Sequence, residues 1–372
     1  MLRRYLVAVA VLASCYAGAA LAADGDSVAP YHVGAAMRVI HPPIARDWRG
    51  AQTKALVTNI WYPVDPTVPE TAHDIGDPAH AVFEGHPRAV DAPLSPAHAT
   101  YPLLLLSHGT GGSAASLDWL GAALAAHGYI VAGVNHPGNN ALEPVTIDGF
   151  ILWWERATDV SEVLDSVLAD PTLGAHIDTS RIGAVGYSLG GYTVLELAGA
   201  RTDQKHFLDF CASSAADAIC HPPEMKRLPD GPHVPDHLSA ETTASMARSS
   251  ESYRDERIKA VFAIAPALGE AFNQDSFIDV HIPVSLMAGT EDKIAPVQTN
   301  IHRIAGLLPN ATVQMVTGAG HETYLDTCLP GMGDRLPATC NDGPGVDRDA
   351  VHAQAVEEAL AFFKGTLPVQ TQ

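Results

Sequence analysis

Short apolar runs alternate with amphipathic segments along most of the chain. Uninterrupted apolar runs of strand length are typical of strands buried on both faces of a parallel sheet. Two earlier segments, 33–41 and 55–62, are rich in β-branched and aromatic residues and also predict strands. The buried runs are 103–106, 129–134, 181–188, 259–265, 284–289 and 312–317.

The segments between the apolar runs have the spacing of helices. In 153–169, apolar residues such as Trp154, Val160, Val163 and Val167 recur every three to seven positions, as on one face of a helix. Strands that alternate with helices predict an α/β fold with a mostly parallel, doubly wound sheet. Further helices are predicted over 115–127, 192–200, near 297–307 and over 349–364.

Two segments break this alternation. Residues 64–100 contain many Pro, His, Asp and Ala without periodicity, which predicts a long surface excursion. Its His73, His80 and His86 stand apart in a Pro-rich region, and we interpret them as solvated side chains, with no metal site. Residues 201–256 contain prolines, two cysteines and short helical pieces, and we interpret them as an insertion that forms a lid or a pocket wall.

The first 22 residues have the pattern of an export signal. Arg3 and Arg4 precede a nearly apolar stretch that ends in Ala20-Leu21-Ala22, a small-x-small cleavage site. A single folded domain is then expected over 23–372, and we expect the mature protein to be secreted to the periplasm or the exterior. An alternative is lipoprotein anchoring at Cys15, since Leu12-Ala13-Ser14-Cys15 resembles that cleavage box. No other apolar run approaches the ~20 residues needed to span a bilayer.

Four cysteines remain beyond the signal, and they agree with export. Four cysteines allow three pairings, of which the two local ones close short loops and are favoured. Each local disulfide would stabilise the fold by roughly 2.5–3 kcal/mol. A zinc site is disfavoured because no Cys-x-x-Cys pair occurs. The favoured pairs are Cys211–Cys220 and Cys328–Cys340.

Charge narrows the classes of partner. The chain has 22 basic and 42 acidic residues, a net charge of −20. Nucleic acids and anionic membrane surfaces would be repelled by such a field. No nucleic-acid partner is therefore expected. No stable membrane span is predicted either, and the oligomeric state stays open.

The strongest chemical signal is Gly186-Tyr187-Ser188-Leu189-Gly190, between the predicted strand 181–188 and helix 192–200. A serine nucleophile at the top of such a sheet needs a tight, strained turn, and flanking glycines let strand and helix approach each other. The motif alone is weak, so its strand-turn-helix context carries the prediction. Ser188 is the candidate nucleophile.

A glycine-rich turn follows the strand that ends near Ser107. Acyl transfer develops negative charge on a carbonyl oxygen, which preorganised donors stabilise. We predict that the backbone N–H groups of Thr110 and Leu189 form this oxyanion hole, and that His108 braces the turn. The turn reads Ser107-His108-Gly109-Thr110-Gly111-Gly112.

The acid and the base should follow the nucleophile in the order Asp or Glu, then His. Asp292 directly follows the run 284–289, with Glu291 as a less favoured neighbour. His321 lies in a Gly-rich loop after the run 312–317, whereas the other histidines beyond Asp292 lie in or at helices. Ser188, Asp292 and His321 thus form the predicted triad. We also hypothesise that a Cys328–Cys340 disulfide fixes the loop that carries His321.

Several motifs resemble the α/β-hydrolase superfamily, and within it the platelet-activating-factor acetylhydrolase and dienelactone-hydrolase-like branch. The resemblance covers about 31–365 and implies a Ser-Asp-His esterase without a cofactor, acting on short or oxidised acyl esters. The motifs are NIWYP at 59–63, HGTGG at 108–112, HGY at 127–129, HPG at 136–138, WER at 154–156 with Asp159-Val160, GYSLGG at 186–191 and RDERI at 254–258.

The chain departs from that branch in two ways. Dienelactone hydrolases use a cysteine nucleophile, whereas Ser188 stands here. The acetylhydrolases place their acid after the strand equivalent to 259–265, where this chain has Pro266 and, further on, Glu270. The acid is therefore assigned to Asp292. Arg156 and Asp159 are interpreted as structural, either paired with each other or with Arg156 bracing the active-site loops.

The sequence predicts an exported carboxylic-ester hydrolase whose partner is a small-molecule ester substrate, with short-chain acyl or lipid-like esters expected. Two alternatives remain open. A peptidase or amidase could use the same triad, and a binding protein without catalytic activity could share the scaffold.

Overall fold

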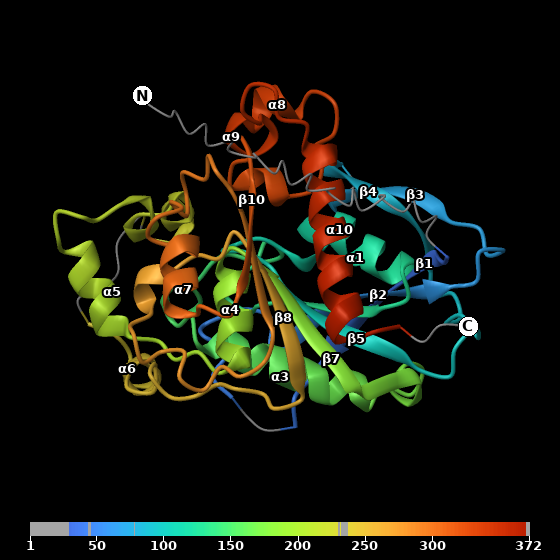
Figure 1. The fold of residues 1–372 in the computed structure, drawn as a ribbon, viewed down its shortest axis with the longest axis horizontal. Coiled ribbons are helices and arrows are strands. Elements are labelled where there is room, and N and C mark those ends of the chain that lie inside the picture. Colours follow the sequence, from blue (N-terminus) through green and yellow to red (C-terminus); the bar gives the residue numbers. More distant parts are fainter. Residues whose placement is uncertain (1–29, 44–45, 78, 230, 232–236, 370–372) are drawn as a thin grey trace, which may run out of the picture.

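A ten-stranded sheet runs through the molecule in the order β10-β9-β8-β7-β5-β6-β2-β1-β4-β3 (Figure 1). The computed structural model describes residues 30–43, 46–77, 79–229, 231 and 237–369. The predicted export signal 1–22, its boundary at Ala23 and Cys15 lie outside the described residues.

Six neighbouring strands of this sheet are parallel, as the apolar runs predict. The leucines at 103–106 are at most 1% exposed, which confirms a strand buried on both faces. The parallel strands are β5 (Tyr101–Ser107), β6 (Ile130–Asn135), β7 (Ile177–Tyr187), β8 (Ile258–Ile264), β9 (Val284–Gly289) and β10 (Thr312–Val316).

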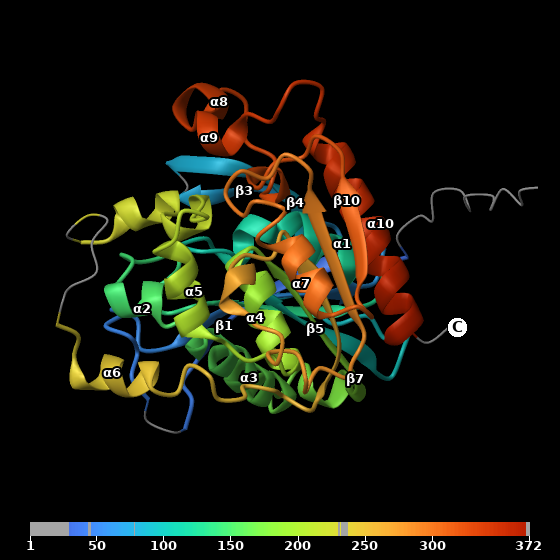
Figure 2. The same ribbon diagram turned by 60° about the vertical axis from the view of Figure 1, so that its left-hand side comes forward.

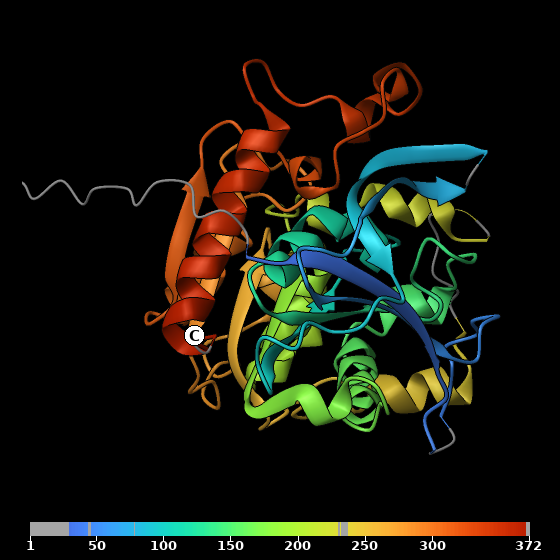
Figure 3. The same ribbon diagram turned by 90° about the vertical axis from the view of Figure 1, so that its right-hand side faces the viewer.

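Helices cover both faces of the sheet (Figures 2 and 3). Helices α1 (Asp118–Ala126) and α10 (Arg348–Thr366) pack against each other on one face. Helices α3 (Glu155–Leu168) and α4 (Leu189–Ala198) pack together on the other. The carboxyl ends of the parallel strands therefore open between two helical layers, where ligands bind in α/β folds.

The region 64–100 differs from its prediction. It is not an unstructured excursion but contains a hairpin of β3 (Thr71–Asp77) and β4 (His80–Val90), which joins the sheet beside β1 (His32–Ile40). β1 in turn pairs antiparallel with β2 (Leu56–Val64). The hairpin lies at the edge of the sheet, where one side is exposed, so its strands tolerate the polar residues and the proline that hid their pattern.

The insertion 201–256 is built of short helices, as predicted. It contains α5 (Gln204–Cys211), the 3₁₀ turns Ala218–Cys220 and Pro223–Arg227, and α6 (Ala240–Met246). Helices α5 and α6 lie on the same side of the molecule as α2 (Ile147–Ile151) (Figure 2). The remaining helices are α7 (Ile301–Leu307), α8 (Met332–Arg335) and α9 (Pro337–Cys340).

Two disulfides join the local pairs of cysteines. Cys211–Cys220 closes a loop inside the insertion, and Cys328–Cys340 links the segment after His321 to α9. Among the described residues, no helix has the length and apolarity needed to cross a membrane.

Candidate active site

Ser188 occupies the turn between β7 and α4 in a conformation that side chains rarely adopt, with φ 57° and ψ −120°. Such strain persists only where the surroundings impose it, and it clusters at functional sites. A Cβ atom on Gly186 would lie 2.0 Å from the carbonyl oxygen of Gly190, and one on Gly190 would lie 1.9 Å from that of Ser107. The two glycines of the motif are therefore required by the close approach of strand, helix and the neighbouring turn.

The structure brings the three predicted triad residues together. His321 Nε2 lies 2.8 Å from Ser188 Oγ, and His321 Nδ1 lies 2.6 Å from Asp292 Oδ2. The second oxygen of Asp292 accepts the backbone N–H groups of Ile294 and Ala295 at 3.0 and 2.7 Å, which fixes the carboxylate. All three triad side chains are buried, whereas the alternative acid Glu291 is exposed.

Glu270 does not contact His321 in the described structure. In the sequence it is the carboxylate nearest to the position where the acetylhydrolases have their acid. Its Oε2 pairs with Arg303 at 2.9 Å and with His206 at 3.0 Å. Glu270 thus braces the α5 and α7 region, and Asp292 is the carboxylate that contacts His321.

The contact with Asp292 makes the imidazole of His321 more basic. Burial alone would lower the pKa of His321, but the charge and hydrogen bond of Asp292 outweigh it and raise the pKa above its usual value. Tyr187 holds the same loop from below, since its hydroxyl donates to the carbonyl of His321 at 3.0 Å. Neutral His321 therefore has an oriented Nδ1–H and a free Nε2 lone pair directed at Ser188.

Thr110 and Leu189 line one pocket together with Ser188. Within the part of the chain that the structure describes, neither of their backbone N–H groups has an acceptor. The neighbouring Gly111 is held from both sides: its N–H donates to Asn139 at 2.6 Å, and its carbonyl accepts from Arg227 at 2.6 Å. The turn is thus fixed while two donors beside Ser188 stay available.

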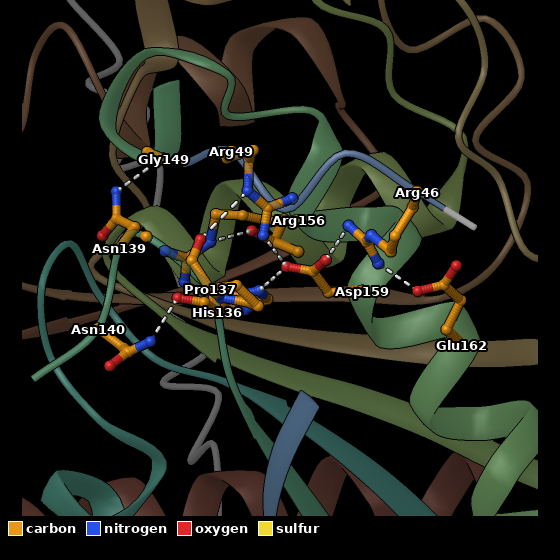
Figure 4. Close-up of polar contacts among 12 residues, drawn as sticks. Arg46, Arg49, His136, Pro137, Asn139, Asn140, Gly149, Arg156, Asp159 and Glu162 are labelled. Carbon is orange, nitrogen blue, oxygen red and sulfur yellow. Dashed lines mark hydrogen bonds and ion pairs between the residues drawn. The ribbon is translucent and has the colours of Figure 1, made fainter. Parts of the chain in front are cut away.

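A buried polar network lies beneath this turn (Figure 4). Asp159 accepts from Arg46, from Arg49 at 2.7 Å and from His136 Nδ1 at 2.8 Å. His136 Nε2 then lies 2.9 Å from Ser107 Oγ. The paired arginines keep the pKa of Asp159 well below its usual range although burial opposes ionisation.

Arg156 connects this network to the turn. It donates to the carbonyl of His108 and, at 3.4 and 3.3 Å, to the hydroxyls of Ser107 and Thr193. Of the two roles predicted for Arg156, the structure therefore has the bracing one, and Asp159 pairs with Arg46 and Arg49 instead.

His108, in the same turn, is fully buried, and its two ring nitrogens both contact backbone groups. His108 Nδ1 lies 2.6 Å from the carbonyl of Gly109, and Nε2 accepts the N–H of His136 at 3.2 Å. Burial lowers the pKa of His108 well below its usual value, so it stays neutral. Sequence reasoning missed the roles of Arg46 and Arg49, because nothing local links them to residues about 110 positions away.

The histidines of the hairpin differ in part from the prediction of solvated side chains, because His73 is largely buried and neither of its ring nitrogens has a hydrogen-bond partner among the described residues. His80 pairs with Asp77, while His73 and His86 lie 4.0 and 3.6 Å from Asp118. In the described ranges, no group of three or more His, Cys, Asp or Glu side chains has the geometry of a metal site.

The pocket beside Ser188 has a volume of about 260 Å³. Its walls are mostly apolar, and much of them comes from the insertion 201–256. Lining residues from the insertion are Gln204, Phe207, Leu208, Ile219, Cys220, Pro222, Glu224, Met225, Leu238 and Met246.

Residues 103–328 match the Alpha/beta hydrolase family, and the chain belongs to that family. It is 32% identical over 108 residues to Cutinase est1 of Thermobifida alba, which is 28% of this chain and 33% of that protein. It is 35% identical over 89 residues to Lipase 1 of Moraxella sp. (strain TA144), which is 23% of this chain and 24% of that protein. The matches thus span a third or less of the length of these relatives.

A solved ferulic acid esterase from Streptomyces cinnamoneus shares the fold, with a TM-score of 0.55 and 19% identity over 93% of this chain and 92% of that one. These proteins are named as a cutinase, a lipase and an esterase. The resemblance to the acetylhydrolase and dienelactone-hydrolase branch therefore stays a prediction.

Proposed function

We propose that the protein is an exported serine carboxylic-ester hydrolase. The observation that carries the proposal is the continuous hydrogen-bonded chain from Asp292 through His321 to Ser188, which ends at an apolar pocket. The names of the relatives, cutinase, lipase and ferulic acid esterase, support ester cleavage. Two disulfides and the signal-like N-terminal sequence support export.

In this proposal, Ser188 Oγ attacks the ester carbonyl while His321 Nε2 accepts its proton. The oxyanion receives hydrogen bonds from the N–H groups of Thr110 and Leu189. His321 then returns the proton to the leaving alcohol, which leaves an acyl group on Ser188. Water, deprotonated by the same imidazole, hydrolyses this acyl-enzyme, and Asp292 holds the imidazole orientation throughout.

The pocket favours a compact apolar group on the ester. A volume of about 260 Å³ with mainly apolar walls suits short-chain acyl or lipid-like esters. We therefore place short and medium acyl esters ahead of long chains.

A labelled fluorophosphonate tests the nucleophile, because it forms a covalent bond with an activated serine. We expect modification of the wild type at Ser188, located by peptide mass spectrometry, and none in the Ser188→Ala variant. A protein that binds esters without cleaving them would stay unlabelled.

A panel of nitrophenyl esters of increasing chain length, with Ser188→Ala as the blank, then defines the substrate class. Matched nitroanilides separate the alternatives, because an esterase turns over the esters far faster, whereas comparable rates on the anilides would indicate a peptidase or amidase.

A further inference from the structure

Among the described residues that line the pocket beside Ser188, Glu224 is the one acidic side chain. Its Oε2 is buried and has no hydrogen-bond partner in the described part of the chain. Buried carboxylate oxygens are normally satisfied, because an unpaired one loses its hydration without compensation. An unpaired oxygen in the wall of an apolar pocket therefore points to a ligand group as its partner.

The 3₁₀ turn Pro223–Arg227 places Glu224 toward the active-site loop. Side chains three residues apart eclipse each other in a 3₁₀ helix, so Glu224 and Arg227 share one face. Arg227 donates to the carbonyl of Gly111 at 2.6 Å, directly beside the proposed oxyanion donor Thr110. The face that carries Glu224 therefore lies toward the residues 108–112.

Packing anchors the 3₁₀ turn Pro223–Arg227. Buried Leu228 forms an apolar cluster with Val145 and Phe150, and Met225 packs against that cluster. Phe150 and Met225 also line the pocket. Because Met225 and Leu228 are packed and Arg227 is hydrogen-bonded, the turn that carries Glu224 is anchored to the pocket wall.

Electrostatics support a position near the reacting groups. The charge of Glu224 is one of the smaller causes, after Asp292, that raise the pKa of His321, and it also helps to raise that of Tyr187. A charge felt by both residues acts within the site. Across the pocket, the wall is apolar, with Phe207, Trp153 and Leu268 among its members.

From these observations we infer that Glu224 is a specificity-determining residue that binds a hydrogen-bond donor, a hydroxyl or a protonated amine, on the apolar part of the ester. The inference rests on the proposed function. An apolar chain that ends in a donor would fill the pocket and satisfy the carboxylate, whereas a chain that ends in methyl would leave it desolvated and unpaired.

Two matched series of esters test this inference. The acyl series contains the 4-nitrophenyl esters of hexanoic, 6-hydroxyhexanoic and 6-(dimethylamino)hexanoic acid. The alcohol series contains the acetates of 1-hexanol, 1,6-hexanediol (monoester) and 6-(dimethylamino)hexan-1-ol. The quantity measured is kcat/KM for each donor-ended ester divided by that for its methyl-ended partner.

In the series whose variable part occupies the pocket, we expect Glu224→Leu to lower both ratios about tenfold or more. Glu224→Gln keeps an acceptor without the charge, so it should lower the amine ratio and largely preserve the hydroxyl ratio. Glu241→Gln removes a charge from an exposed position of the same insertion and should change neither ratio.

Ratios that stay within twofold of wild type in both series for Glu224→Leu would overturn the inference. That result would leave the proposed function intact if turnover still depended on Ser188. Loss of the Ser188 dependence would instead overturn the proposed function itself.

Discussion

His136 Nδ1 lies 2.8 Å from the carboxylate of Asp159, in a pairing that repeats the contact of His321 with Asp292. Ser107 completes the repeat, since its Oγ lies 2.9 Å from His136 Nε2. The described part of the chain therefore contains two Ser-His-Asp arrangements, one that opens on the pocket and one that is fully buried.

The surroundings shift the pKa values of the His136 and His321 imidazoles in opposite directions. Burial, followed by the charge of Arg156, lowers the pKa of His136 to about 3, against the opposing effect of Asp159. For His321 the effect of Asp292 prevails, and the pKa is raised. His136 thus stays neutral and acts as a fixed hydrogen-bonding element, while His321 can take up and release a proton.

The first prediction concerns Asp292 and pH. Only neutral His321 can accept the serine proton, so kcat/KM should fall as the pH decreases through a His321 pKa above 6.5. Asp292→Asn removes the charge that raises this pKa, so the inflection should move to lower pH. By analogy with other triads, kcat should fall ~10⁴-fold. Initial rates from pH 5 to 9 measure both effects, and a variant with more than a tenth of wild-type activity would contradict the assignment.

The second prediction concerns the brace beneath the oxyanion turn. Arg156→Lys keeps a cation but loses the fork that holds the His108 carbonyl and the Ser107 hydroxyl. A displacement of about 1 Å at the turn should lower kcat by ~10–100-fold with little change in KM. Arg248→Lys, in an exposed ion pair with Glu155, is the control. Equal kinetics of the two variants would show that the brace does not position the turn.

The third prediction concerns stability and a buried carboxyl on α4. Burial raises the pKa of Glu196 to about 8, while its Oε1 accepts from Tyr192 and Thr202, each at 2.6 Å. Because the pKa of Glu196 is higher in the folded than in the unfolded protein, the protonated carboxyl stabilises the folded state. This stabilisation is complete below the pKa of the unfolded protein, near 4.5, and is lost as the pH rises toward 8. The loss is at most about 1.4 kcal/mol for each pH unit.

Urea unfolding at pH 5 and at pH 8.5 measures this effect. Glu196→Gln should reduce the difference between the two pH values, whereas Glu241→Gln should leave it unchanged. Burial also raises the pKa of Asp326 to about 8. Asp326 should therefore maintain part of the pH dependence of stability in every variant. An undiminished difference in Glu196→Gln would show that this side chain is ionised in the folded protein.

The fourth prediction concerns the disulfide next to the histidine loop. Asp342 lies two residues after Cys340, and its carboxylate accepts a hydrogen bond from the hydroxyl of Thr323 at 2.6 Å. Thr323 in turn lies two residues after His321. We propose that Cys328–Cys340 holds this contact, so that reduction lowers activity before the protein unfolds. The double variant Cys328→Ser/Cys340→Ser should lose activity, and its remaining activity should resist reductant. Circular dichroism on the same samples monitors folding, and full activity of the variant would refute the proposal.

Much of the geometry of the candidate site could be predicted because it depends on local sequence and on strand order. Apolar runs identify the parallel strands, and the carboxyl ends of such strands meet at one edge of the sheet. Ser188, Asp292 and His321 each follow one of these runs, so their convergence follows from the topology. The glycines around Ser188 report the same close packing in the sequence itself.

Other features depend on contacts between distant segments. The hairpin β3–β4 was missed because an edge strand does not need the apolar alternation of a half-buried one. Arg49 contacts Asp159, 110 positions away, and Arg227, three residues after Glu224, contacts Gly111, 116 positions away. The sequence by itself determined the parallel strands, the turn that carries Ser188 and the chain order of Ser188, Asp292 and His321, since these follow from local pattern and chain order. Only the tertiary structure decided which charges are buried together and which carboxylate faces the pocket, because burial depends on how distant segments pack.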